Sequence, residues 1–364
     1  MFVVTNREIK NPKRYTGLDI FGPRPNPKGP NELRIIEITK QGDDYLTEPV
    51  PDRLKIDEAR ALKRSFRLDI DERQVRHGSL RLACEIMRQA AQQQRHVLVY
   101  VHGYNNDMSD VVKTVEEIEA LYKVIVLPFS WPADGGGVVS GTTAYLNDKQ
   151  DARASMDALN RFLEKLQFFH SKLVQARKDE LWEKASGAFP TNHTAAQQRF
   201  AELLDADCKV SLNMLCHSMG NYVLKYALRP TQAASKQLIF DNISLVAADD
   251  NNEAHAAWVE QLQVRNRLYI TINENDFALE WSRRKPGDEQ KARLGRYLKQ
   301  LTARNARYID VTGAEAVNNA HNYFTGKPVQ RNAALKTLFS QALEGGRAEE
   351  GLDYAVDINA YRLR

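Results

Sequence analysis

The sequence predicts an α/β protein with a doubly wound, mostly parallel sheet. Short, continuous apolar runs such as VLVYVHG, which begins at Val97, have the length and composition of strands buried on both faces. Between such runs lie stretches with apolar side chains at helical spacing, as in residues 111–121. Strands that alternate with helices in this way predict parallel strands with helices on both faces of the sheet.

At 364 residues, the chain is long enough for one large α/β domain with insertions or for two smaller domains. The expected strands lie near residues 2–5, 33–39, 97–101, 123–131, 208–216, 243–248, 267–273 and 307–311. The expected helices lie near residues 80–93, 111–121, 148–166, 218–228, 253–262 and 333–343.

Three sections lie outside this regular alternation or interrupt it. Residues 1–90 are expected to form an N-terminal extension that adds strands to the sheet, ahead of a core over residues 91–345. Residues 170–206 are polar and predicted to be helical, which indicates an insertion within the core. The charged tail, residues 346–364, is expected to be peripheral.

The composition is ordinary for a soluble globular enzyme, with 43% hydrophobic and 27% charged residues. No apolar run approaches the roughly 18 residues that span a bilayer. The opening MFVVTNREIK has too short an apolar stretch for a secretory signal. We therefore expect a cytoplasmic protein without stable membrane insertion.

Neither the charge nor the cysteines point to nucleic acid or metal. The net charge is only +4, and acidic residues are interspersed among the basic ones between Arg53 and Arg95, as on a solvated surface. Cys84, Cys208 and Cys216 are too few for a disulfide framework, and no Cys/His cluster has zinc-ligand spacing. The sequence thus predicts no metal, no cofactor and no nucleic-acid partner, and it does not define the oligomeric state.

A tight turn between a strand and a helix carries the candidate nucleophile. Cys216-His217-Ser218-Met219-Gly220 stands where the G-x-S-x-G elbow of α/β-hydrolases stands. The residues two before and two after the serine must be small, which Gly220 satisfies and Cys216 satisfies only in part. We predict Ser218 as nucleophile and the Met219 N–H as an oxyanion donor. The alternative is a serine that only caps the following helix.

A second loop follows the strand VLVYV directly and begins with His102-Gly103-Tyr104-Asn105. In α/β-hydrolases, a loop at this place supplies the second N–H of the oxyanion hole. Gly103 allows the backbone to approach a substrate closely, and either Tyr104 or Asn105 is the expected donor. Gly103 and His217 are also expected to contact the substrate.

The general base must follow the nucleophile in this fold, where the order is serine, acid, histidine. Two histidines lie after Ser218. His255 lies in a predicted helix, whereas His321 follows the last core strand in a loop rich in asparagine. We therefore predict His321 as the base.

The acid has two candidate positions. Asp276 follows RLYITINEN, at the carboxyl end of the penultimate core strand, and is the preferred residue. Asp249 and Asp250 follow ISLVAA, one strand earlier, and remain the alternative. We expect this earlier pair to cap a helix that starts near Asn252. The acid would hold the imidazole tautomer and stabilise the imidazolium.

These motifs resemble those of a bacterial branch of the α/β-hydrolase superfamily known as a domain of unknown function. The similarity extends from VVTNR to about Phe324, with residues 170–206 outside it. Ala or Gly is commoner in that branch where Cys216 stands. The motifs, in order, are HGYNN, FSWPADG, Tyr145…Asp148…Ala152…Ser155, CHSMGN, NENDFAL and HNYF.

The resemblance implies a triad of Ser218, Asp276 and His321, and it indicates Trp131 and Tyr145 as further residues of the substrate site. It implies no particular substrate. Apart from the resemblance, the sequence predicts that Asp148 caps a helix.

The predicted function is hydrolysis of a small-molecule carboxylic ester through an acyl-enzyme. Lipase, thioesterase or amidase action on the same fold is the alternative within this class, although the polar composition of residues 170–206 speaks against a lipid substrate. The alternative from a different class is a non-catalytic α/β-hydrolase scaffold that acts as a binding module.

Overall fold

The computed structural model of the protein describes residues 1–133, 141–207, 210–228, 239–284 and 291–364, and within these the backbone alone for residues 141–146. The chain divides into two compact units. Unit 1 comprises Met1–Pro49, His96–Phe162 and Ser211–Arg364, whereas unit 2 comprises Val50–Arg95 and Leu163–Val210.

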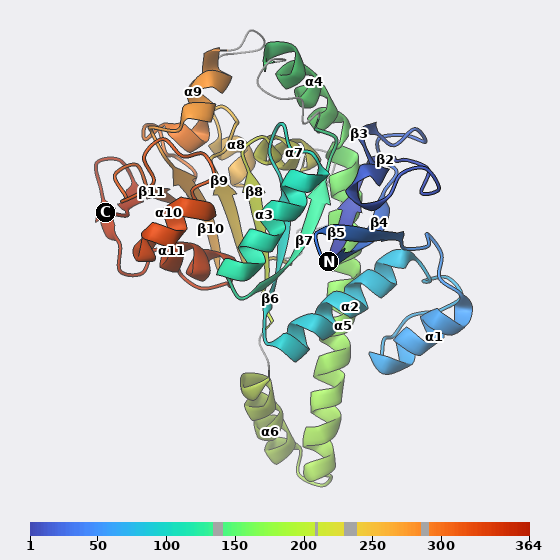
Figure 1. The fold of residues 1–364 in the computed structure, drawn as a ribbon. Coiled ribbons are helices and arrows are strands. Elements are labelled where there is room, and N and C mark those ends of the chain that lie inside the picture. The colour runs from blue at the N-terminus through green and yellow to red at the C-terminus, as the bar shows by residue number, and fades with distance from the viewer. Residues whose placement is uncertain (134–140, 208–209, 229–238, 285–290) are drawn as a thin grey trace. The chain divides into compact units, whose positions relative to one another are not determined.

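Unit 1 is built on a sheet to which eleven strands of the described chain contribute (Figure 1). In spatial order they are β12 (Asp353–Ala355), β13 (Ala360–Arg362), β11 (Ala306–Asp310), β10 (Arg267–Ile272), β9 (Asn242–Val246), β8 (Leu212–His217), β6 (His96–Val101), β7 (Val124–Ser130), β1 (Phe2–Thr5), β4 (Arg34–Gln41) and β5 (Asp44–Pro49). A small separate sheet pairs β2 (Arg7–Ile9) with β3 (Phe21–Pro25).

Neighbouring strands from β13 through to β1 run parallel. The pairs at the two ends of the sheet, β12–β13, β1–β4 and β4–β5, are antiparallel. Every residue of β7, β8 and β9 is buried. This burial on both faces explains why these strands are continuous apolar runs rather than alternating patterns.

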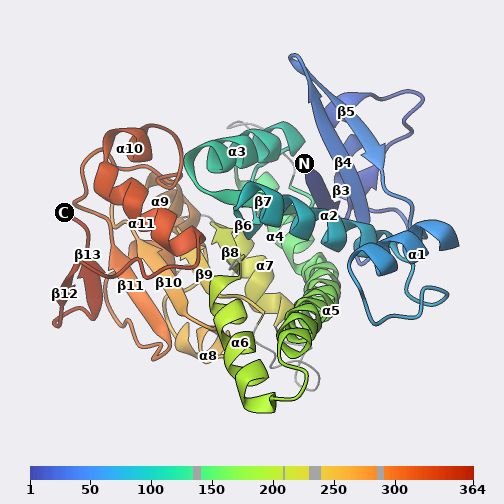
Figure 2. The ribbon, with the colours of Figure 1, turned by 90° about the horizontal axis from the view of Figure 1, so that it is seen from below.

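Helices of unit 1 cover both faces of the sheet (Figures 1 and 2). One face carries α3 (Met108–Leu121), α10 (Gly326–Arg331) and α11 (Ala333–Leu343). The opposite face carries α7 (Gly220–Ala227) and α8 (Ala256–Val259). The remaining helices are α4 (Gly141–Ala154), which contacts α7, and α9 (Phe277–Arg284), which follows β10. In the described part of the chain, 3-10 turns span Gly17–Ile20 and Leu294–Arg296.

Unit 2 is helical in its described part. It contains α1 (Ile56–Ser65), α2 (Gly78–Gln93), α6 (His193–Ala206) and, from Leu163 onward, the long helix α5 (Met156–Ala188). An apolar cluster joins the two stretches of chain and includes Leu54, Leu68, Leu80, Cys84, Phe169 and Leu173. Residues distant in sequence thus share one small core.

The sheet confirms the predicted fold class, an α/β fold with a doubly wound, mostly parallel sheet. The observed elements add detail that the sequence pattern did not contain. The charged tail supplies β12 and β13 at one edge of the sheet. The predicted extension over residues 1–90 contributes strands up to Pro49, and its remainder packs with residues 163–210 as unit 2.

Candidate active site

The side of the sheet to which the chain adds new strands changes at β6. After β6 it adds β7 on one side, then returns to add β8 on the other side of β6 and proceeds outward. At such a switch point, the loops after two neighbouring parallel strands diverge and leave room for a ligand at the carboxyl edge. The loop with Gly103 follows β6, and Ser218 follows β8, so both predicted site segments begin at this point.

The two segments are in contact. Val101 pairs with Cys216 across β6 and β8, which aligns the residues that follow. A Cβ atom added to Gly103 would lie 2.8 Å from the Cβ and 3.3 Å from the Oγ of Ser218. Since real Cβ atoms do not approach that closely, only glycine lets the backbone of this loop lie against the serine.

Ser218 occupies a strained turn. Its φ of 52° lies in the left-handed region, which residues with side chains rarely adopt. Its N–H donates to the carbonyl oxygen of Val246 at 3.0 Å, which ties the turn to β9. A Cβ on Gly220 would lie 2.5 Å from the carbonyl oxygen of Val101, so the turn needs glycine there. The N-cap of α7 is Met219 rather than Ser218, which argues against a mere helix cap.

Asn221 braces this turn, and the sequence analysis gave it no role. Its Nδ2 donates to the carbonyl oxygens of Cys216 and Ser218, at 3.0 Å each, and the residue is completely buried. Cys216 is equally buried, and burial raises the pKa of its thiol. The available signal was the final letter of the CHSMGN motif. Asn221 fixes the carbonyl groups on both sides of His217.

A carboxylate and an imidazole meet beyond the ends of β10 and β11. Oδ2 of Asp276 lies 2.7 Å from Nδ1 of His321, and Oδ1 accepts the backbone N–H of Leu279 at 3.0 Å. Asp276 is completely buried, whereas the side chain of His321 is 22% exposed. Because the carboxylate accepts at Nδ1, a neutral ring carries its proton there and leaves Nε2 without one.

The loop that carries His321 is anchored to the end of β10. The side-chain amide of Asn273 donates to the carbonyl oxygens of Asn318 and Ala320 at 3.1 and 3.0 Å. The backbone N–H of Phe277 donates to the carbonyl oxygen of Asn319 at 3.3 Å. These bonds hold the acid and the base in one rigid arrangement.

His217 links this pair to the nucleophile turn. Its ring centroid lies 4.6 Å from that of His321, and its Nε2 lies 3.4 Å from the carbonyl oxygen of His321. Burial, and then the neighbouring His321, hold the pKa of His217 well below its usual value. The structure therefore brings His321 beside the residue that directly precedes Ser218. A contact of His217 with substrate remains a prediction.

The alternative acids have other partners. Asp249 forms an ion pair with Nε of Arg293 at 3.1 Å and accepts the hydroxyl of Ser282 at 2.5 Å. Asp250 pairs with Nζ of Lys225 at 2.9 Å. Of the candidate acids, Asp276 is the one that bonds to His321.

The expectation that Asp249 and Asp250 cap a helix was wrong. The helix of this region, α8, begins at Ala256, and its N-cap is His255. The imidazole of His255 is buried between the carbonyl oxygen of Asn252, at 2.6 Å, and the hydroxyl of Tyr308, at 2.5 Å. His255 therefore braces the turn, as a histidine outside the site.

The loop after β6 is held by a carboxylate of α4. The backbone N–H of Asn105 donates to Oδ2 of Asp148 at 3.2 Å, and Asp148 is completely buried. The expectation that Asp148 caps a helix was wrong, because it lies in the interior of α4 and binds another segment. Since the N–H of Asn105 is engaged with this carboxylate, the geometry favours Tyr104 as the second oxyanion donor.

Trp131 supports the loop from within. It is completely buried, its indole donates to the carbonyl oxygen of His102 at 2.9 Å, and its ring stacks on the His102 ring at 5.2 Å. A completely buried side chain cannot contact a substrate, so the prediction that Trp131 contacts the substrate was wrong. Trp131 instead supports the loop after β6. The other residue that the resemblance indicated, Tyr145, has its side chain outside the described residues.

His102 is a neutral, buried histidine. Its Nε2 accepts the backbone N–H of Trp131 at 3.2 Å, and its Nδ1 donates to the carbonyl oxygen of Gly103 at 2.8 Å. Burial, with the nearby Arg7, lowers the pKa of His102 to about 3. The guanidinium of Arg7 is itself buried and binds the carbonyl oxygens of Asn106 and Ala133 at 2.7 and 3.2 Å.

Comparison with known families agrees with the fold. A family model described as "Alpha/beta hydrolase of unknown function (DUF900)" matches residues 82–173. No match was found among curated proteins or among solved structures. The matched segment includes the loop with Gly103 but ends before Ser218. The match covers less than half of the chain, and together with the doubly wound sheet it is consistent with an α/β-hydrolase fold, as the sequence motifs suggested.

Among the residues that the structure describes, no helix is long and apolar enough to cross a membrane. Within the same part of the chain, no group of three or more His, Cys, Asp or Glu residues is arranged to hold a metal ion. Cys84 and Cys216 are free thiols there, and Cys208 lies outside the described residues.

Proposed function

We propose that the protein is a serine hydrolase that cleaves small carboxylic esters through an acyl-enzyme. The observation that carries the proposal is the bond between buried Asp276 and His321, next to a strained turn that presents Ser218. Nucleophile, base and orienting acid follow the chain order of α/β-hydrolases. The hydrolase class itself rests on the fold and the family match.

The first half-reaction forms the acyl-enzyme. Nε2 of His321 takes the proton of the Ser218 hydroxyl as Oγ attacks the ester carbonyl carbon. The backbone N–H groups of Met219 and Tyr104 donate to the oxyanion of the tetrahedral intermediate. When the intermediate collapses, the bond to the alcohol oxygen breaks, and the alcohol leaves with the proton that His321 held.

The second half-reaction repeats these steps with water. His321 removes a proton from water, the hydroxide attacks the acyl carbon, and Ser218 leaves with the proton returned by His321. Asp276 stays ionised throughout and stabilises the imidazolium through Nδ1. The supporting residues are those that hold the geometry: Gly103, Gly220 and Asn221 around the nucleophile.

The test is turnover of p-nitrophenyl acetate and butyrate, with thioester and anilide analogues to separate the finer classes. Ser218→Ala should lower kcat to the background, by about 10⁶-fold. Ser282→Ala is the matched control, because Ser282 is also buried but bonds to Asp249, and it should retain activity within about tenfold. A folded wild type that cleaves none of these compounds would instead favour the non-catalytic scaffold.

The cytoplasmic localisation expected from the sequence stays a prediction. It can be checked by fractionation of cells that express the full chain.

A further inference from the structure

Three buried polar side chains from distant parts of the sequence meet beside the loop that carries the expected oxyanion donor. They are Arg7 at the start of β2, His102 directly after β6, and Ser130 at the end of β7. Each of them is at most 2% exposed. They belong to the motifs VVTNR, HGYNN and FSWPADG, and the proposed serine chemistry gives none of the three a role.

The two ring nitrogens of His102 have fixed and opposite roles. Nδ1 lies 2.8 Å from the carbonyl oxygen of Gly103, and because a carbonyl oxygen can only accept, Nδ1 carries the proton. Nε2 lies 3.2 Å from the backbone nitrogen of Trp131, and because that N–H can only donate, Nε2 carries no proton. The imidazole is therefore neutral and is held in one tautomer.

Ser130 connects this imidazole to Arg7. Nε of Arg7 donates to Oγ of Ser130 at 2.9 Å, so the hydroxyl proton of Ser130 points to another acceptor. Nε2 of His102 is an acceptor and lies 3.4 Å from the same Oγ, so the hydroxyl donates there. Because a guanidinium keeps its protons at any working pH, the direction of these bonds does not reverse.

The bond from His102 also sets the direction of the Tyr104 N–H. The carbonyl group of Gly103 and the N–H of Tyr104 belong to one planar trans peptide, in which the two groups point in opposite directions. Since the carbonyl group is held toward His102, the N–H of Tyr104 points away from it and is available to a ligand atom on the other side of the loop.

Arg7 holds the next part of the same loop directly. Its Nη2 donates to the carbonyl oxygen of Asn106 at 2.7 Å, and the side-chain amide of Asn106 donates to the carbonyl oxygen of Tyr104 at 2.6 Å. One buried cation thus fixes the peptide groups on both sides of Tyr104, through Ser130 and His102 on one side and through Asn106 on the other.

We propose that Arg7, Ser130 and His102 form a buried relay of hydrogen bonds that orients the Tyr104 N–H toward the oxyanion. The inference rests on the proposed serine chemistry, in which this N–H donates to the tetrahedral intermediate. The three side chains touch no reacting atom and are positioning residues. A donor that is already oriented stabilises the transition state more than the bound substrate, so the relay acts on kcat rather than on KM.

The test measures transition-state stabilisation in Arg7→Met, which keeps a long side chain but removes its donors. With p-nitrophenyl acetate, kcat should fall about 10²-fold while KM stays within about twofold. A trifluoromethyl ketone forms an adduct with Ser218 that carries the same oxyanion, and its affinity should fall by about the same factor as kcat. Arg7→Lys should recover part of both losses.

Two further variants test the relay one bond at a time. Ser130→Ala removes the link between Arg7 and His102 with a small change of volume, and should lower kcat about tenfold. It also serves if Arg7→Met does not fold. His102→Asn places an amide N–H near the position of Nδ1 and should retain more activity than His102→Leu, which offers no donor to Gly103.

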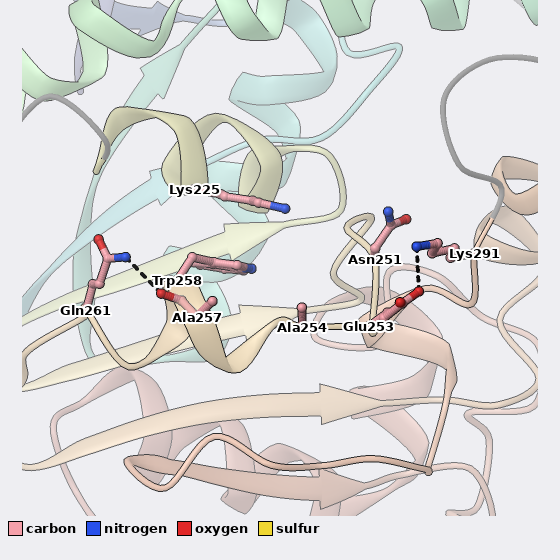
Figure 3. Close-up of a pocket in the computed structure, with 8 residues that line it drawn as sticks. All are labelled: Lys225, Asn251, Glu253, Ala254, Ala257, Trp258, Gln261 and Lys291. Carbon is pink, nitrogen blue, oxygen red and sulfur yellow. Dashed lines mark hydrogen bonds and ion pairs between the residues drawn. The ribbon is translucent and has the colours of Figure 1, made fainter.

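Two cations outside the relay serve as controls. Arg267→Met removes a guanidinium that bonds to Glu349 at the start of β10. Lys291→Met removes an ammonium group that pairs with Glu253 at 2.6 Å beside the cavity drawn in Figure 3. Both variants should keep kcat and inhibitor affinity within about threefold, because neither cation bonds to the loop after β6.

NMR of ¹⁵N-labelled protein reads the tautomer of His102 without any substrate, and His102→Asn assigns its resonances. One ring nitrogen should carry a proton in the wild type, and Arg7→Met or Ser130→Ala should increase the other tautomer. Wild-type kcat and inhibitor affinity in folded Arg7→Met or Ser130→Ala would overturn the relay and leave the serine chemistry intact. A wild type without esterase activity would contradict the serine chemistry instead, and an Nε2-protonated His102 in that protein would overturn the relay as well.

Discussion

Two turns at the carboxyl edge of the sheet each hold a buried aspartate, but with different partners. After β9, Asp249 pairs with Arg293 at 3.1 Å; after β10, Asp276 bonds to His321 at 2.7 Å. The two aspartates are 5% and 0% exposed. Both aspartates are therefore buried, and they differ in the side chain to which each one binds.

The partner decides what each carboxylate can do. A guanidinium stays protonated at any working pH, so Asp249 and Arg293 form a fixed structural pair. An imidazole can take and release a proton, so Asp276 can serve a reaction. The Asp249 N–H also donates to the carbonyl oxygen of Ser218 at 3.2 Å, which gives this turn a part in holding the nucleophile's backbone.

The largest expected effect separates these two aspartates. Asp276→Asn should lower kcat by about 10⁴-fold, because an amide that donates to Nδ1 imposes the wrong tautomer on His321. Asp249→Asn should change kcat by less than about tenfold but lower the free energy of unfolding by about 3–5 kcal/mol, since it leaves Arg293 buried without its charge partner. Steady-state kinetics and urea unfolding measure the two quantities. A greater loss of kcat in Asp249→Asn would reverse the assignment.

The next effect concerns the contact between the two loops at the switch point. Gly103→Ala would place a methyl group against Ser218 and should lower kcat about 10²-fold by displacing the nucleophile or the oxyanion donors. Gly313→Ala is the matched control, because a methyl group at Gly313 would meet no atom within 4 Å beyond its two chain neighbours. Circular dichroism checks that both variants fold. Equal activity of the two would mean that this loop does not approach the reacting atoms.

The sequence motifs predicted the fold class because buried parallel strands and amphipathic helices leave periodic patterns. They also singled out Ser218, Gly220 and Gly103, since a strained turn and a close backbone approach restrict the residue type locally. The pairing of Asp276 with His321 was preferred from chain order, and the structure brings these two residues together.

Other features depend on contacts between distant segments, which no local pattern contains. Trp131 is aromatic and follows a strand, but only the packing shows that His102 covers it. Asp148 resembles a helix cap in sequence, yet its carboxylate binds the loop of Asn105, 43 residues away. The joining of residues 50–95 with 163–210 in unit 2 likewise rests on long-range packing.

A smaller effect is expected from the support of the oxyanion loop. Asp148→Ala removes the acceptor of the Asn105 N–H and should lower kcat about tenfold, with little change in KM, because it loosens a donor used in the transition state. Asn147→Ala, an exposed neighbour on the same helix, is the control and should be neutral. An unchanged kcat in Asp148→Ala would show that α4 does not support the oxyanion loop.

The smallest effect is on stability against pH. The pKa of His102 is lowered to about 3 in the folded protein from an ordinary 6.5, so below pH 6.5 the unfolded chain binds a proton that the folded chain does not. Stability is therefore full above pH 6.5 and falls on acidification toward pH 3, by up to about 1.4 kcal/mol per pH unit from this group. Urea unfolding of wild type and His102→Gln between pH 7 and pH 5 should show a shallower slope in the variant. Identical slopes would contradict a neutral, buried His102.

The most direct test of the proposed site is a map of covalent labelling by a fluorophosphonate probe. The probe reacts with a serine only when a base activates it and an oxyanion hole receives the phosphoryl oxygen. Mass spectrometry of digested wild-type protein should find one adduct, on the peptide that contains Ser218, and Asp276→Asn should slow its formation strongly. No adduct on the folded protein, or an adduct on another serine, would contradict the assignment.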